Sequence, residues 1–202
     1  TGLRMESNQA AAKVPEQHFN NQQIIRLASQ GYTGSTAGAW AKLFSANGLQ
    51  SIPGDATANY QQLGHFMALQ SQANAKAMGV QNIPGQLTAE AASGSTNWTP
   101  TAIKRATRIN DANATGVELF NQGMERAIND SANGKGIFAA RDFQNAWSRT
   151  YDVDAMRLHN AIQSGDTAEQ NAVIQAVGGK NSPGAKRLAA KMQALDALIS
   201  GR

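Results

Sequence analysis

The sequence of 202 residues predicts an all-α protein: a multi-helical bundle of about eight or nine helices, with one long central helix and short helical hairpins. Three observations support this fold class. Apolar residues recur at spacings of three and four, as on one face of a helix. No window shows the apolar-polar alternation of a strand. An eleven-residue phrase returns 31 residues later, a period typical of a helix-turn-helix unit.

The repeated phrase occupies residues 48–58 and 79–89, and seven of its eleven positions are identical. Each copy begins with a glycine, which can adopt the left-handed conformation that ends many helices. An Ile-Pro-Gly turn follows, and its proline prevents the previous helix from continuing. We expect the two turns to be equivalent helix junctions, with Ile52 and Ile83 packed into them.

The chain is predicted to have three regions. Residues 1–16 have little apolar periodicity and contain Pro15, so we expect an extended N-terminal arm. Residues 17–99 form a short-helix repeat region that contains both Ile-Pro-Gly turns. Residues 100–202 form the long helix and a C-terminal helical bundle.

The repeat region opens with a helix that ends near Gly31 and a second helix that ends at Asn47-Gly48, a normal C-terminal signal. A third helix starts after Asp55 and stops at Gly79. The apolar residues that define these three helices are, in order, Phe19, Ile24, Leu27 and Ala28; Trp40, Leu43 and Phe44; and Tyr60, Leu63, Phe66 and Met67.

The long helix is predicted over about residues 100–132, with Thr99 as its cap and Pro100 in its first position. It would span roughly 50 Å. Its inward positions step by three and four and include two asparagines. They are Ile103, Ala106, Asn110, Asn113, Val117, Phe120, Met124 and Ala127.

Four further helices are predicted after the break at Gly134-Lys-Gly136. The first carries Phe143 and Trp147. The second starts at Asp152 or Asp154, carries Leu158 and Ile162, and stops at Gly165. Asp166 and Glu169 have the spacing of a capping box and open the third. Ser182-Pro183 starts the last, whose apolar stripe is Leu188, Met192, Leu195 and Ile199.

The composition predicts a thin core and a polar, weakly charged surface. Hydrophobic residues make up 41% of the chain, but aromatic residues only 6% and charged residues only 16%, which is below the usual quarter. The absence of cysteine excludes disulfides, thiolate metal sites and cysteine nucleophiles. No apolar run is long enough for a transmembrane helix, and we expect no cofactor.

Catalytic signals are weak. His18, His65 and His159 lack metal-ligand spacing, so they are interpreted as solvated or packing residues, with His65 on a polar helix face. A peptidoglycan-cleaving enzyme would need carboxylates as acid and base. The isolated candidates are Glu90, Glu118, Glu125 and Asp142. Flanking charges of this kind normally solvate a helix face, so no catalytic residue is assigned.

Two basic clusters are candidates for phosphate contacts, although neither is dense nor interleaved with aromatic residues. The net charge of +4 is only a mild excess. The first cluster lies on the first turns of the long helix and the second around the start of the last helix. Their residues are Lys104, Arg105 and Arg108, and Lys180, Lys186, Arg187 and Lys191.

Asn110 and Asn113 have two interpretations. Either this part of the long helix faces solvent, or the asparagines lie in the apolar seam, where polar residues often fix register or oligomeric state. On the second interpretation, Asn110, Asn113, Val117 and Phe120 form an assembly seam between copies. Replacing both asparagines by leucine would then raise stability and loosen control of the oligomeric state.

The cysteine-free style, rich in Asn, Gln, Ala and Gly, resembles virion proteins of tailed bacteriophages, particularly internal, ejected or tail-associated proteins. Residues 14–21 (VPEQHFNN), 31–36 (GYTGST) and 141–147 (RDFQNAW) carry the likeness. The resemblance implies a structural or DNA-delivery part rather than a metabolic enzyme. It assigns no functional residue.

These observations favour a non-enzymatic structural protein of a tailed-bacteriophage particle. It would assemble with itself or other virion proteins, be made in the bacterial cytoplasm, and possess no catalysis of its own. One version is an internal protein ejected with the DNA or guiding it. Two alternatives remain open: a peptidoglycan-degrading virion-associated domain, and a helical nucleic-acid-binding module.

Overall fold

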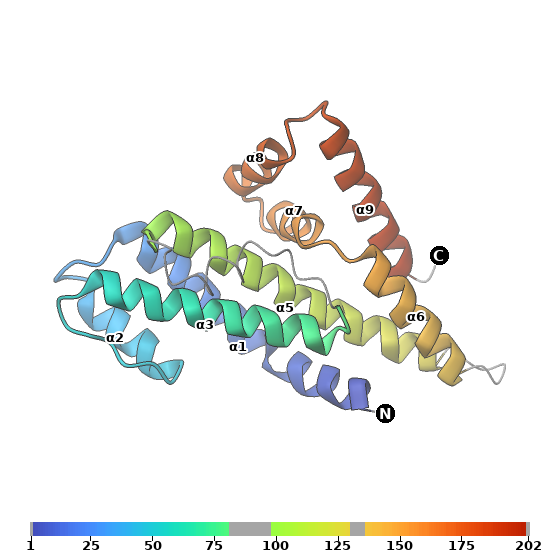
Figure 1. The fold of residues 1–202 in the computed structure, drawn as a ribbon, viewed down its shortest axis with the longest axis horizontal. Helices are drawn as coiled ribbons and strands as arrows, with labels where there is room; N and C mark the ends of the chain where they lie inside the picture. The colour runs from blue at the N-terminus through green and yellow to red at the C-terminus, as the bar shows by residue number, and fades with distance from the viewer. Residues whose placement is uncertain (1, 81–97, 130–135, 201–202) are drawn as a thin grey trace. The chain divides into compact units, whose positions relative to one another are not determined.

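The computed structural model describes residues 2–80, 98–129 and 136–200. Within those ranges the chain forms eight α-helices and no strand, which confirms the all-α prediction (Figure 1). The helices are α1 (Gly2–Gln30), α2 (Ala37–Ala46), α3 (Ala56–Ala77), α5 (Pro100–Asn129), α6 (Gly136–Thr150), α7 (Val153–Gln163), α8 (Thr167–Ala176) and α9 (Pro183–Ser200).

The predicted N-terminal arm over residues 1–16 is wrong, because α1 begins at Gly2 and runs through Pro15. The proline removes a single helical hydrogen bond. Against that, residues 10–12 are three alanines, the strongest helix formers. Ser7 and Val14 lie seven residues apart on one face of α1, and both are buried. The helix is therefore stabilised by packing that its weak apolar periodicity does not reveal.

Contacts divide the chain into two compact units that do not follow the predicted regions. Unit 1 contains residues 1–14, 74–81 and 112–202, and unit 2 contains residues 15–73 and 82–111. The predicted boundaries at 16/17 and 99/100 are corrected accordingly. Each of α1, α3 and α5 contributes residues to both units, because a long helix presents successive turns to different neighbours.

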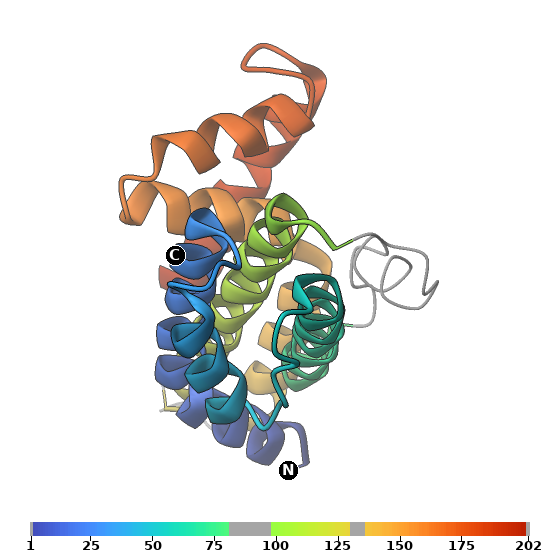
Figure 2. The same cartoon turned by 90° about the vertical axis from the view of Figure 1, so that its left-hand side faces the viewer.

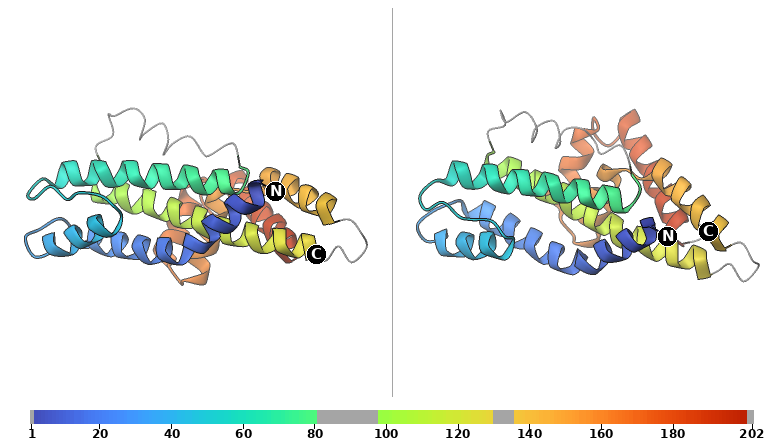
Figure 3. Two further views of the ribbon diagram at one scale, coloured as in Figure 1. Left: turned by 90° about the horizontal axis from the view of Figure 1, so that it is seen from below. Right: turned by 60° about the horizontal axis from the view of Figure 1, so that its bottom comes forward.

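Unit 2 has an aromatic core. Trp40 of α2 contacts Tyr32, Phe44 and Tyr60, with ring centroids between 5.8 and 6.3 Å apart. The helices of this unit lie side by side, and Figure 2 shows several of them nearly end-on (Figure 3). Their buried apolar side chains form one cluster, which includes Leu63 of α3 and Ile103 of α5.

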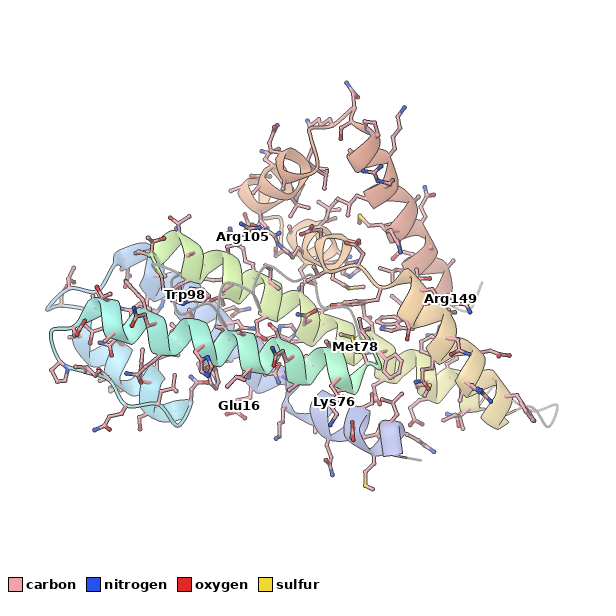
Figure 4. All side chains as sticks on the ribbon, viewed as in Figure 1. Glu16, Lys76, Met78, Trp98, Arg105 and Arg149 are labelled. Carbon is pink, nitrogen blue, oxygen red and sulfur yellow. The ribbon has the colours of Figure 1, made fainter. Side chains whose placement is uncertain are left out.

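A tryptophan packs directly on the backbone of α3 in unit 2. Trp98, labelled in Figure 4, lies just before α5. Its indole fills the space beside Gly64. A Cβ atom on Gly64 would overlap the indole ring. Only glycine permits this approach.

Unit 1 has its own aromatic column. Phe120 of α5 contacts Phe143 and Trp147 of α6, with ring centroids 5.7 and 5.6 Å away. Trp147 stacks on Tyr151 at 5.7 Å. Further along the chain, α7 packs against α8 and α9, and α9 also packs against α6. The predicted inward positions Val117, Phe120, Phe143 and Trp147 are all buried.

The two copies of the repeated phrase begin with the same helix ending. Gly48 and Gly79 both have φ near +68°. The amide of Leu49 donates to the carbonyl of Phe44 at 2.8 Å, and that of Val80 donates to Ala75 at 3.0 Å. This pairing across six residues is the Schellman ending of a helix. Residues 81–89 of the second copy lie outside the described residues, so the comparison covers only these helix ends.

Ile52 does not fill the junction as predicted, since the residue is 42% exposed. The turn is held by a buried amide instead. The Ile52 amide donates to Oδ1 of Asn59 at 2.8 Å, and Nδ2 of Asn59 donates to the Ile52 carbonyl at 2.8 Å. One side chain thereby satisfies both backbone groups of Ile52, so the turn needs no apolar plug.

Most predicted helix starts are confirmed. Thr99 accepts from the amide of Ala102 at 3.2 Å, and Oδ1 of Asp152 accepts from the amides of Asp154 and Ala155. At the start of α8, Asp166 accepts from the Glu169 amide at 3.0 Å, as in a capping box, and the Glu169 side chain also bonds to Arg157. The apolar residues Phe19 and Ile162, predicted on inward faces, are exposed.

Candidate functional site

The asparagines of the long helix are buried, so the solvent-facing interpretation is wrong. Asn110 is 0% exposed and Asn113 2% exposed. In unit 2, Nδ2 of Asn110 donates to Oδ1 of Asn21 at 3.2 Å and also to Oε1 of Gln70. Its Oδ1 accepts from Oγ of Ser71 at 3.2 Å. One amide therefore joins α5 to α1 and to α3.

Asn113 belongs to unit 1 and has a different partner. Its Oδ1 accepts from the hydroxyl of Tyr151 at 2.5 Å, whereas its Nδ2 is buried without a partner among the described residues. Burial raises the pKa of Tyr151, and the nearby Asp152 carboxylate adds to the shift. The hydroxyl therefore stays protonated and remains a donor well into the alkaline range.

The predicted assembly seam is corrected by these contacts. Asn110, Asn113, Val117 and Phe120 are all buried within a single chain. Their neighbours are side chains of the same chain, such as Asn21, Tyr151 and Phe143. Residues covered in this way have no exposed surface to offer a second copy. The seam fixes the alignment of helices inside each unit.

The carboxylates considered as catalytic groups do not gather. Glu118 is exposed and accepts from Gln122 at 3.3 Å, and Asp142 is also exposed. Glu125 forms an ion pair with Arg4 at 3.0 Å. Glu90 lies outside the described residues. None of the three described carboxylates pairs with another carboxylate in the part of the chain that the structure describes.

A buried ion pair in unit 1 was missed by sequence reasoning. Arg157 of α7 bonds to Glu169 of α8 at 2.7 Å, and their side chains are only 7% and 6% exposed. Arg157 also contacts Asp154 at 2.8 Å. The capping-box spacing of Glu169 concealed this role. The Arg157–Glu169 pair links α7 to α8, whereas the Arg157–Asp154 pair lies within α7.

The histidines do not form a metal site among the described residues, where no group of three metal-ligating side chains occurs. His65 is exposed, as predicted. His18 of α1 lies 2.6 Å from Oδ1 of Asp111 on α5, and Asn21 donates to the same oxygen at 3.1 Å. His18 is thus a packing residue within unit 2.

The two basic clusters belong to different units, residues 104–108 to unit 2 and residues 180–191 to unit 1. In unit 1, Lys191 donates to the carbonyl of Arg149 at 2.9 Å. Arg187 borders a hollow of about 460 Å³ that also contains Asp152 and Asp154. These carboxylates offset the positive charge. Lys186 and Arg187 are exposed, as is Arg105 of the other cluster, in which Lys104 and Arg108 are partly buried. Phosphate contacts by these residues remain a prediction.

The surface of unit 2 carries a hollow of about 300 Å³ between α1 and α2. We call it the α1–α2 groove. Its floor is formed by Leu27 and Leu43, and Phe19, a residue that is 61% exposed, stands at its edge. The full lining is Phe19, Asn20, Gln23, Arg26, Leu27, Ala39, Lys42, Leu43 and Ala46. It combines apolar surface with two cations and no carboxylate.

Comparison with known proteins finds no relative of this chain. No family model matches the chain, and searches of curated proteins and of solved structures find no significant match. Among the described helices, none combines the length and apolar character that crossing a membrane requires.

Proposed function

We propose that this chain is a non-enzymatic structural protein of a tailed-bacteriophage particle, where it assembles with other virion proteins or with itself. In this proposal it is made in the bacterial cytoplasm, incorporated into the virion, and can serve as an internal protein that is ejected with the DNA or guides it. The phage assignment is based on the sequence style described above.

The observation that carries the assembly role is the α1–α2 groove. Exposed apolar side chains scattered over a surface are normal. Here the exposed Phe19 adjoins a hollow with a leucine floor, which resembles the sites where proteins bind one another through an apolar centre and a polar rim. A chain whose helices are aligned by internal hydrogen bonds can present such a surface in a fixed shape.

The direct test is the composition of purified particles. We expect mass spectrometry of density-purified virions to detect this chain at a constant ratio to the major capsid protein, and cryo-electron microscopy to locate it. A chain found only in the soluble fraction of the infected cell would refute the proposal.

The non-enzymatic part of the proposal has its own test. Zymography on bacterial peptidoglycan should give no clearing by the purified chain. Clearing that disappears in Glu118→Gln, Glu125→Gln or Glu90→Gln would establish the lytic alternative instead. Asn145→Ala, which changes an exposed residue of α6, is the control for nonspecific effects of substitution and purification.

A further inference from the structure

We infer that the α1–α2 groove binds an acidic amphipathic helix of another protein. The inference deepens the proposed function, because it names the kind of partner through which the chain would assemble. That the partner is another protein of the particle rests on the proposed function. That it is an acidic amphipathic helix rests only on the residues of the groove.

The groove has the shape to hold a helix. α1 and α2 form a hairpin that is fixed at both ends: Asn20 donates to Asn47 at 3.1 Å, and the indole of Trp40 donates to the Gly31 carbonyl at 3.2 Å. Between these ends the two walls run for about two helical turns, or roughly 11 Å. This length fits the i, i+4 anchors of a helix that lies in a groove.

The two walls of the groove allow a partner helix to approach closely. Ala39 and Ala46 of α2 are both exposed and lie seven residues apart on one face, so the wall on that side is low. Phe19 on α1 forms a high opposite edge. The buried Leu27 and Leu43 provide an apolar floor. Two medium-sized apolar side chains of a partner helix would contact this floor and the Phe19 ring.

The charge of the rim selects the partner. Arg26 and Lys42 line the groove, and no carboxylate does. Arg26 donates to the neutral Gln23 at 2.6 Å, and neither cation forms an ion pair with any residue that the structure describes. A helix with aspartate or glutamate beside its apolar anchors would therefore find both charges available, and a basic helix would be repelled.

The test uses labelled synthetic helices and the full chain. The first peptide has two leucines four residues apart, with glutamates flanking them in an alanine background. The second has lysine at each glutamate, and the third keeps the glutamates but has serine at each leucine. Fluorescence anisotropy gives the affinity, and amide shifts in NMR spectra locate the contact. We expect only the first peptide to bind, with shifts confined to residues 19–27 and 39–46.

Variants on the protein test the same contacts. Arg26→Glu with Lys42→Glu should weaken binding about tenfold, and Ala39→Trp should block the groove. Phe19→Ser should also weaken binding. Leu69→Ser is the matched control for Phe19→Ser, because Leu69 is another exposed apolar residue of unit 2 but lies outside the groove. Lys76→Glu, an exposed lysine of α3, is the control for the charge reversals. Circular dichroism verifies that each variant is folded.

Several results would overturn the inference: no binding, equal binding of the lysine peptide, or an affinity that the charge reversals leave unchanged. A dimer detected by light scattering and dissolved by Phe19→Ser would make a second copy the occupant, which also contradicts it. If the peptide fails but the chain is present in virions, the groove inference fails alone. If the peptide binds but virions lack the chain, the proposed function fails.

Discussion

Asn110 and Asn21 are 89 residues apart in the sequence and are joined by a hydrogen bond of 3.2 Å in the core of unit 2. Both side chains are almost completely buried. The bond couples the alignment of α1 to that of α5. Because Ser71 of α3 donates to the same amide, three helices share one polar contact.

This network reverses the stability change expected from the sequence for the leucine substitution. Asn110→Leu should lower the free energy of unfolding by at least about 2 kcal/mol, because it leaves buried polar partners without a hydrogen bond. Urea unfolding followed by circular dichroism measures the change. The double variant Ser71→Ala, Asn110→Leu should recover part of the loss, because it removes the hydroxyl that Asn110→Leu leaves without its acceptor. An Asn110→Leu variant that is more stable than the parent would contradict this account.

The buried ion pair of unit 1 gives a second prediction. Arg157→Met should destabilise the chain by about 3–5 kcal/mol, since the buried Glu169 carboxylate would lose its guanidinium partner. Replacing both residues by methionine should be far less costly. Arg4→Met is the matched control: its pair with Glu125 is exposed, so its loss should cost less than about 1 kcal/mol. Equal losses for the two single variants would show that burial of the pair is irrelevant.

The raised pKa of Tyr151 predicts how the stability of the chain changes at alkaline pH. Its pKa is raised in the folded state, so folding favours the protonated hydroxyl. This contribution is complete below the pKa of an unfolded tyrosine, about 10, and is lost as the pH rises above it, by up to about 1.4 kcal/mol per pH unit. Urea unfolding of the parent between pH 8 and pH 11 should therefore show a decline above pH 10.

Tyr151→Phe separates this effect from other titrations. At neutral pH it should cost about 1–3 kcal/mol, because Oδ1 of Asn113 loses its donor in a buried position. Above pH 10 its stability should fall less steeply than that of the parent. Parallel pH curves for the two proteins would contradict the assigned role of the phenol.

Gly64 and Trp98 provide a test of packing. Gly64→Ala should destabilise the chain by about 1–3 kcal/mol, because the added methyl group overlaps the indole and forces a rearrangement. Gly38→Ala is the control: a Cβ atom there meets open space on α2, and the stability should be unchanged or raised by up to about 1 kcal/mol. Thermal unfolding ranks the two variants. An unchanged stability of Gly64→Ala would refute the close packing of the Trp98 indole on Gly64.

Local chemistry let the sequence alone determine most helix ends. Thr99, Asp152 and Ser182 cap the helices that their positions predict, and Gly48 and Gly79 end theirs with the same left-handed turn. These features involve residues within a few positions of one another. Helical periodicity also identified the buried apolar face of α5, because that face is long and regular.

Only the tertiary structure determined which side chains are buried in the core. Residues 1–16 have a weak apolar pattern, yet α1 begins at Gly2 because Ser7 and Val14 are buried by packing. Ile52 has the side chain of a core residue but is exposed, since Asn59 already holds the turn. Phe19 likewise lies at the edge of the α1–α2 groove. Hydrophobicity of one residue does not specify which neighbour covers it.

The polar contacts depended on tertiary structure most of all. The spacing of Asn110 and Asn113 placed them on the inward face, but their partners lie on other helices or, for Tyr151, in the link between α6 and α7, 38 or more residues away. Glu169 had the spacing of a cap, and that spacing did not reveal its bond to the buried guanidinium of Arg157 on another helix. Sequence spacing fixes the face on which a polar side chain lies, and only packing decides which group it meets.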